Sequence, residues 1–154
     1  MFESALLEHK LDKETYDREE PTLRTDLLQA QLALVEKKDF SVIVLVTGMD
    51  GAGKGEVIHR LLEWFDPRHV SVEAYGEPDD AERGRPAMWR YWRDLPPAGR
   101  ISIVLGSWYS QPIRERLAGD SGKGRFERDL AAINRFEEML ASEGTLLLLS
   151  LIHI

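Results

Sequence analysis

Residues 42–46 have the sequence Val-Ile-Val-Leu-Val, and residues 48–55 have the sequence Gly-Met-Asp-Gly-Ala-Gly-Lys-Gly. The first stretch is a continuous apolar run, mostly β-branched, which is typical of a parallel strand covered on both faces. The second has the GxxxxGK spacing of a P-loop, and residues 54–65 are predicted to form a helix. A buried strand, a glycine-rich loop and a helix in this order predict a phosphate-binding unit.

A phosphate cradle is the site that this loop predicts. Its glycines let the backbone turn tightly and point several N–H groups inward, and the positive end of the following helix attracts an anion. The ammonium of Lys54 can reach the outer phosphate oxygens. The predicted phosphate-binding residues of the loop are Gly48, Gly51, Ala52, Gly53, Lys54 and Gly55. The competing interpretation is a glycine turn with a surface lysine.

Two positions depart from the common P-loop. Gly55 follows Lys54, where Ser or Thr usually provides a hydroxyl group for magnesium. Asp50 places a carboxylate inside the loop, where it would repel a polyphosphate unless a cation lay between them. We therefore predict that Asp50 faces Mg²⁺, directly or through water. The alternative is that Asp50 is a turn residue that hydrogen-bonds its own backbone.

A second positive region lies between residues 83 and 100, where five arginines and one acid give a local charge of +4 and leave −11 for the remaining chain. Arginine forks bind phosphate oxygens bidentately, and a positive strip on an acidic protein concentrates a polyanion. Trp89 and Trp92 are spaced i, i+3 and are predicted to anchor a helix in the core, whereas Arg90 and Arg93 share another face. The predicted phosphate-binding arginines are Arg85, Arg90 and Arg93. The alternative is ordinary surface charge.

The flanking sequence predicts alternating strands and helices. A helix is expected from just after residues 21–22 to about residue 38, with an apolar stripe formed by Leu23, Leu27, Ala30 and Leu34. Further strands are expected at residues 71–75, 101–105 and 146–154, and further helices at residues 86–95 and 124–142. This alternation predicts a three-layer α/β fold of the P-loop NTPase type with a mainly parallel sheet. We expect residues 1–21 to form a charged arm and residues 22–154 to form the domain.

Composition restricts the class of function. The 154 residues, 43% hydrophobic, are enough for one globular domain. Because 27 acidic and 20 basic side chains give a net charge of −7, we expect neither a nucleic-acid nor a membrane partner. The absence of cysteine excludes a disulfide scaffold, and the four histidines lack zinc-ligand spacing. The N-terminus has no basic head followed by a long apolar run, so we expect a cytoplasmic protein.

Four motifs together resemble the polyphosphate kinase 2 family, whose members are P-loop phosphotransferases similar in fold to thymidylate kinase. They are GMDGAGKG at 48–55, YGEP at 75–78, MWRYWRDLPPAGRI at 88–101 and GSWYSQP at 106–112. The resemblance covers residues 22–150 and implies Mg²⁺-dependent phosphoryl transfer between inorganic polyphosphate and a nucleotide, AMP or ADP. It also implies catalytic and phosphate-holding roles for Asp50 and Lys54, with the arginine segment starting a lid over the polyphosphate. Phosphoryl transfer needs mainly positioning and charge neutralisation, which such residues provide.

One motif departs from the family. Active members usually have Asp-Arg-Ser-Trp-Tyr after the third strand, whereas this sequence has Leu-Gly-Ser-Trp-Tyr at residues 105–109. The missing aspartate is the second acid at the metal, so its loss should weaken magnesium binding. The pattern is similar to the N-terminal domain of two-domain members that convert AMP to ADP. Because the family domain continues beyond the apolar run at residues 146–154, we expect a fragment with exposed leucines, joined to a second phosphotransferase domain or forming a homo-oligomer.

Three functions are therefore compared. The first is phosphoryl transfer from polyphosphate to AMP. The second is a catalytically impaired module that binds polyphosphate or stabilises a partner domain, and Leu105 and Gly106 motivate it. The third is an ATP-dependent nucleoside monophosphate kinase, which the fold class favours and Gly55 disfavours.

Overall fold

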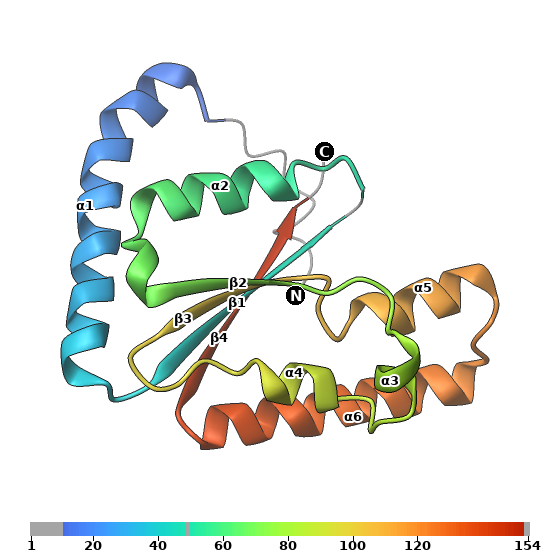
Figure 1. Cartoon of the computed structure of the whole chain (residues 1–154). Helices are drawn as coiled ribbons and strands as arrows, with labels where there is room; N and C mark the ends of the chain where they lie inside the picture. The colour runs from blue at the N-terminus through green and yellow to red at the C-terminus, as the bar shows by residue number, and fades with distance from the viewer. Residues whose placement is uncertain (1–10, 49, 153–154) are drawn as a thin grey trace.

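The computed structural model describes residues 11–48 and 50–152 as an α/β domain (Figure 1). In chain order the elements are α1 (Lys13–Lys37), β1 (Ser41–Gly48), α2 (Lys54–Trp64), η2 (Pro67–His69), β2 (Val70–Ala74), α3 (Asp80–Arg83), α4 (Trp89–Arg93), β3 (Ile101–Leu105), α5 (Ser110–Ala118), α6 (Lys123–Ser142) and β4 (Thr145–Ile152). The four predicted strands and the helix after the glycine-rich loop are confirmed. The helix predicted at residues 86–95 is observed as the shorter α4. Helices α3 and α5 were not predicted.

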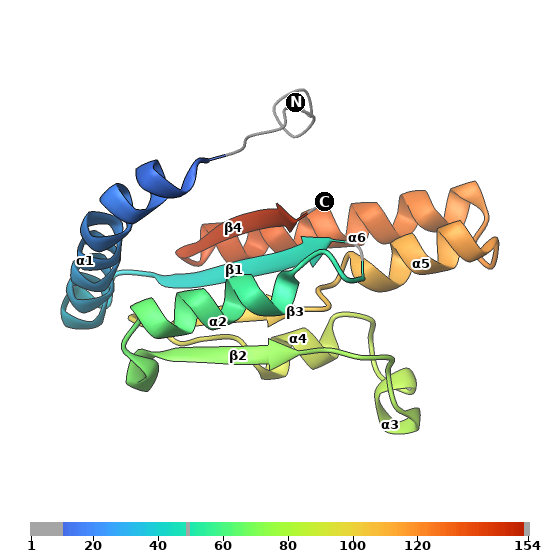
Figure 2. The same cartoon turned by 90° about the horizontal axis from the view of Figure 1, so that it is seen from above.

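All strand pairs in the sheet are parallel, in the order β2-β3-β1-β4 (Figure 2). Val44 of β1 is paired with Ile103 of β3 on one side and with Leu148 of β4 on the other. Helices α1 and α2 lie on one face of the sheet, and α4, α5 and α6 lie on the other (Figure 1). The predicted three-layer fold with a parallel sheet is therefore confirmed.

The β1 strand supplies both halves of the core because its alternating side chains point to opposite faces. Val42 and Val46 pack with Leu34 of α1 and Ile58 of α2. Residues Ile43 and Leu45 pack in a second cluster, whose helical members are Tyr91, Ile133, Phe136 and Leu140 of α4 and α6. The apolar run of β1 is therefore continuous because both faces of the strand are covered, as the sequence predicted.

Helix α1 corrects the prediction of a start after Pro21. The helix begins at Lys13, where the Asp12 side chain accepts a hydrogen bond from Thr15 N (2.8 Å), and it continues through Pro21. A proline inside a helix removes one donor. The carbonyl of Asp17 that loses this donor belongs to an exposed residue, where water can replace the bond. The helical segment is therefore set by the aspartate cap rather than by the proline.

The buried face of α1 also differs from the predicted stripe. Leu34 is buried and Leu27 is half-buried, but Leu23 and Ala30 are exposed. Gln31, which is only 2% exposed, takes the central place on this face. Its Nε2 donates to Asp66 O (3.0 Å), and Asp66 N donates to its Oε1 (2.7 Å). This pair of hydrogen bonds fixes α1 to the turn between α2 and β2.

The buried residue of α4 is Tyr91 rather than either of the two tryptophans predicted as core anchors. Tyr91 is buried, whereas Trp92 is 49% exposed and Trp89 is half-buried. The Tyr91 ring packs edge-on against Tyr75 and Trp108, with centroid distances of 4.8 and 5.4 Å. Trp92 also contacts the core despite its exposure, because its ring packs edge-on against the buried Phe136 of α6 at 5.6 Å.

Strand β4 forms one edge of the sheet, beside β1 (Figure 2). Four of its leucines are between 46% and 61% exposed: Leu146, Leu148, Leu149 and Leu151. The expected exposed leucines are therefore present. Within the part of the chain that the structure describes, no helix combines the length and apolarity needed to cross a membrane.

The Gln31 hydrogen bonds give a stability prediction. In Gln31→Glu a carboxylate loses the N–H donor and faces the Asp66 carbonyl, so unfolding free energy at pH 7 should fall by about 1–3 kcal/mol. Burial raises the pKa of the introduced carboxyl, which can donate once protonated, so the loss should shrink toward pH 5. Urea unfolding at both pH values measures this. Gln29→Glu, at an exposed position of the same helix, is the control, and equal losses in the two variants would contradict the assignment.

Candidate functional site

The glycine-rich loop lies between β1 and α2, at the carboxyl end of the central strand (Figure 1). Three of its glycines have positive φ angles, 145° at Gly48, 81° at Gly51 and 88° at Gly53. A Cβ atom at Gly51 or Gly53 would meet nothing within 4 Å, so the backbone conformation and not lack of space requires glycine there. The loop therefore turns as an anion cradle requires.

Helix α2 begins directly at Lys54, with Gly53 as its N-cap. Among the described residues no side chain caps this end, so the amides of its first turn are available to an anion. Within the described part of the loop, Ala52 is buried. Residue 49 lies outside the described residues.

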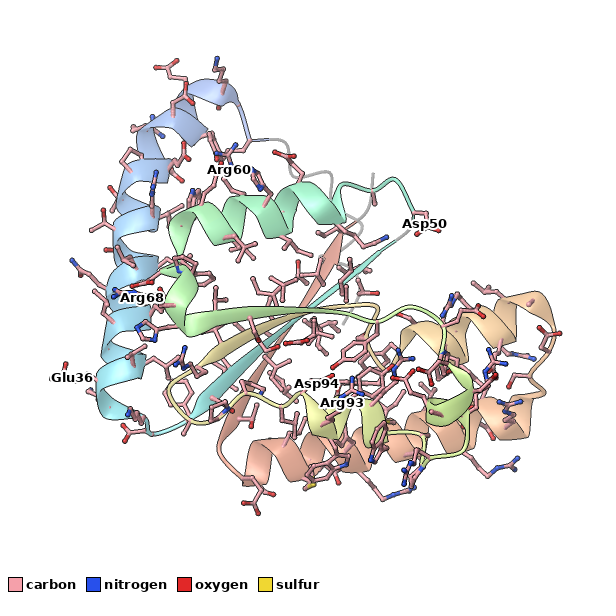
Figure 3. The ribbon with its side chains drawn as sticks, viewed as in Figure 1. Glu36, Asp50, Arg60, Arg68, Arg93 and Asp94 are labelled. Atoms are coloured by element: carbon pink, nitrogen blue, oxygen red, sulfur yellow. The ribbon has the colours of Figure 1, made fainter. Side chains whose placement is uncertain are left out.

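Lys54 and Asp50, the two residues predicted to have catalytic roles, lie close together in the loop. Lys54 Nζ donates to Gly48 O (2.9 Å) and lies 3.5 Å from Asp50 Oδ1. The side chain of Lys54 is mostly shielded from solvent, whereas that of Asp50 is fully exposed at the tip of the loop (Figure 3). The lysine thus bonds the loop back to the end of β1, whereas the Asp50 carboxylate is open to solvent.

The carboxyl end of β3 contains no acid. Leu105 is half-buried and packs against the cluster of α1 and α2, which includes Ile58. Gly106 has a φ of 72°, and a Cβ atom there would overlap the carbonyl oxygen of Tyr75. Tyr75 N also donates to Leu105 O (2.8 Å). Leu105 and Gly106 are the two positions that differ from the family pattern. Leu105 takes part in core packing, and Gly106 takes part in a close contact between main chains.

Asp50 is the carboxylate that the glycine-rich loop itself carries. Among the described residues no three His, Asp or Glu side chains group closely enough to hold a metal ion. Asp50 remains a possible single protein ligand, and this fits Mg²⁺, which proteins often bind through one or two carboxylates plus phosphate oxygens. The ion would supply neutralisation of phosphate charge.

The arginines of the segment do not share one role. Arg90 lies between α3 and β2, where Nη2 is 3.3 Å from Glu82 Oε2 and Nη1 donates to Gly76 O (3.1 Å). Both charged side chains of this pair are largely buried, and Arg90 also lies over the Tyr75 ring. The position of Arg90 is thus a bridge within the segment, and the structure does not bring it to the cradle.

Arg93 makes a two-pronged ion pair with Asp94 (Figure 3), with distances of 2.9 Å from Nε to Oδ1 and from Nη2 to Oδ2. Tyr75 OH also donates to Asp94 Oδ2 (2.9 Å). The Arg93 hydrogen bonds hold the pKa of Asp94 below its ordinary value, with burial opposing and Tyr75 assisting. Burial and the Asp94 hydrogen bond raise the pKa of Tyr75, which keeps its proton as a donor. The charge of Arg93, like that of Arg90, is therefore paired with a carboxylate of the same domain.

Arg85 differs from the other two because its guanidinium lies 5.3 Å from the centre of the Trp89 ring and lines a cavity. The cavity, about 290 Å³, lies between the α3–α4 segment and helices α5 and α6. Only Arg85 of the three predicted arginines combines exposure with an open position beside a cavity. Its role as a phosphate ligand stays a prediction.

Two interactions after β3 were not found from the sequence. Trp108 Nε1 and Tyr109 OH both donate to Glu137 Oε1, at 2.9 and 2.7 Å. Trp108 is also buried against Tyr91 of α4 and Phe136 of α6. Glu137 carried no sequence signal, because an acid on a helix is usually solvated and its partners lie 28 and 29 residues away.

The parallel sheet and the glycine-rich loop between β1 and α2 define an α/β domain of the P-loop class. Residues 10–154 match the family model described as Polyphosphate kinase 2 (PPK2), and the chain belongs to that family. The resemblance deduced from the four motifs is thereby confirmed.

Similar proteins and structures agree with this assignment. The chain is 44% identical over its whole length to a polyphosphate:AMP phosphotransferase of Pseudomonas aeruginosa and 41% identical to one of Pseudomonas syringae, in each case covering 31% of the relative. The crystal structure of a putative polyphosphate kinase 2 from Pseudomonas aeruginosa superposes with a TM-score of 0.94 at 44% identity, covering all of this chain and 34% of that one. Polyphosphate kinase 2 from Arthrobacter aurescens gives 0.88 at 27% identity, over 95% of this chain and 53% of that one. The chain spans about a third of the length of the two phosphotransferases.

The Gly106 contact predicts a stability loss on substitution. Gly106→Ala should lower the unfolding free energy by about 1–3 kcal/mol, because the new Cβ is strained at positive φ and overlaps the Tyr75 carbonyl. Chemical denaturation measures it. Gly124→Ala in α6, where an added Cβ meets only ordinary contacts, should equal or exceed wild-type stability. A harmless Gly106→Ala would refute the close contact.

Proposed function

We propose that this chain binds inorganic polyphosphate in the cradle at residues 48–55, as part of a protein that transfers phosphoryl groups between polyphosphate and AMP or ADP. The observation that carries the proposal is the cradle itself: positive-φ glycines, an uncapped helix start and a lysine held at its mouth. Relatives named polyphosphate:AMP phosphotransferases support the substrate class. The lack of a hydroxyl at Gly55 disfavours an ordinary ATP-dependent kinase.

The roles of the residues follow from their chemistry. The first-turn amides of α2 and Lys54 Nζ would bind phosphate oxygens, for which Lys54 exchanges part of its contact with Gly48 O. Asp50 would face Mg²⁺, which would otherwise have only phosphate oxygens and water as ligands. When bound, the ion neutralises charge on the transferring phosphoryl group. The protein's part is to fix the phosphate chain and the carboxylate in one place.

A second candidate function is binding of polyphosphate without turnover. Leu105 and Gly106 favour it, because a core side chain and a main-chain contact occupy the positions where active members carry the acid and the arginine. A single carboxylate holds magnesium less tightly than two. In this case phosphoryl transfer would take place in another part of the longer protein.

Lys54→Ala tests the cradle. Loss of a charge-assisted contact should weaken polyphosphate binding by about ten- to hundredfold in isothermal titration calorimetry. Lys37→Ala, an exposed lysine at the end of α1, is the control and should bind as wild type does. Unchanged affinity in Lys54→Ala would remove the proposal's main support.

A turnover assay separates the two candidates in the same samples. Polyphosphate-dependent formation of ADP from AMP that disappears in Lys54→Ala identifies the chain as catalytic. Binding that depends on Lys54 without ADP formation identifies a binding module.

Asp50→Asn tests the metal-facing role. Without magnesium, removal of the negative charge should strengthen polyphosphate binding by up to about fivefold, because the exposed carboxylate repels the polyanion. Addition of magnesium should increase the polyphosphate affinity of Asp50→Asn less than it increases that of the wild type. Calorimetry in EDTA and in excess magnesium gives both numbers. Equal gains in the two proteins would show that Asp50 is a turn residue only.

A further inference from the structure

The cavity between the α3–α4 segment and helices α5 and α6 is separate from the cradle, because no residue of the 48–55 loop lines it. Both apolar and polar side chains line it, among them Met88, Tyr91, Trp108, Ile133, Gln111 and Arg125. At about 290 Å³ it has room for a small organic ligand rather than only water.

Most charges around this cavity are already paired. Glu82 is bound to Arg90, and Glu115 is bound to Arg125 at 2.7 Å. Arg83 uses Nε to donate to Pro78 O (3.0 Å). For Arg85, no ion pair or side-chain hydrogen bond is found within residues 11–48 and 50–152. Arg83 and Arg85 therefore both carry a positive charge on this wall without an acidic partner among the described residues, and of the two only Arg85 also lacks a side-chain hydrogen bond.

Arg85 is nevertheless held in place. Its main-chain N–H donates to Glu82 O (3.0 Å), and its guanidinium stacks on Trp89. Arg93 lies on the same ring at 5.4 Å and is itself fixed by Asp94, which accepts from Tyr75. A chain of contacts thus runs from the end of β2 to Arg85. Stacking occupies a guanidinium face and leaves the N–H groups at its edge available to a bidentate acceptor.

We propose that Arg85 binds a phosphate group of a ligand in this cavity, and that Trp89 is a positioning residue for it, whereas Arg90 and Arg93 serve the architecture of the segment. The proposal rests on the proposed function, because it requires a phosphorylated ligand. A phosphate matches the planar fork of an arginine and compensates its unpaired charge. The phosphate can belong to AMP or to a polyphosphate chain, since both carry the same group.

The test is calorimetric titration of the 154-residue chain with AMP and, separately, with inorganic polyphosphate. Arg85→Gln should weaken the affinity for one of these ligands at least about tenfold. Arg135→Gln is the matched control, since Arg135 is exposed on α6 and lies outside the cavity lining. Trp89→Leu should lower the affinity for the same ligand severalfold. Trp89→Phe, which keeps an aromatic face, should retain most of the wild-type affinity. Thermal melting shows whether each variant is folded.

The outcomes are distinct. A loss for AMP alone assigns the phosphate to the nucleotide, a loss for polyphosphate alone assigns it to the chain, and either supports Arg85 as the ligand-binding arginine. Wild-type affinity of Arg85→Gln for both ligands, with polyphosphate binding still dependent on Lys54, overturns this proposal and leaves the proposed function standing. Equal losses in Arg85→Gln and Arg135→Gln overturn it as well, because bulk charge would explain them. A wild-type chain that binds neither ligand ends both proposals.

Discussion

The close approach of main chains at the carboxyl ends of β1 and β3 is the constraint on which the site depends. Gly48 lies against the carbonyl of Ile152, and Gly106 lies against the carbonyl of Tyr75, so that a Cβ atom at either position would overlap an oxygen. These contacts fix the points at which two loops leave the sheet. The first loop then turns through positive-φ glycines into α2, and the second leads through the buried Trp108 into α5. A side chain at either glycine would displace the loop that carries the chemistry.

The sequence allowed much of the fold to be predicted because local patterns have direct physical causes here. The apolar run of β1 is buried on both faces, and the glycine-rich loop before Lys54 has the conformation that only glycine adopts easily. The beginning of α1 could not be predicted, because Pro21 is a common start signal and the short Asp12 cap is not distinctive. The Gln31 contact was equally hidden: its partner is the main chain of Asp66, which no side-chain pattern reveals.

The arginine segment shows where prediction of a site ends. From sequence, three arginines beside a P-loop were equivalent, since each carries the same charge and the same fork. Their difference comes from partners brought together by folding: Glu82 for Arg90, and Asp94 with Tyr75 for Arg93. The local charge of the segment is thus partly neutralised from within. A count of charges therefore overstates the attraction for a polyanion, and the contact geometry decides which arginine is available.

The two changes after β3 have a joint structural effect that a comparison of charges misses. Leu105 contributes to the cluster under α2, and Gly106 permits the approach of Tyr75, whose hydroxyl orients Asp94 and through it Arg93. The positions that hold charge in active members thus support packing in this chain. Putting an aspartate at 105 would cost burial of a charge, and putting an arginine at 106 would force the β3 loop away from β2. The phosphate binding proposed for the cradle requires neither side chain. In that proposal binding depends on β1 and α2, whereas the acid expected from the family motif would depend on β3, so the two functions would be structurally separable.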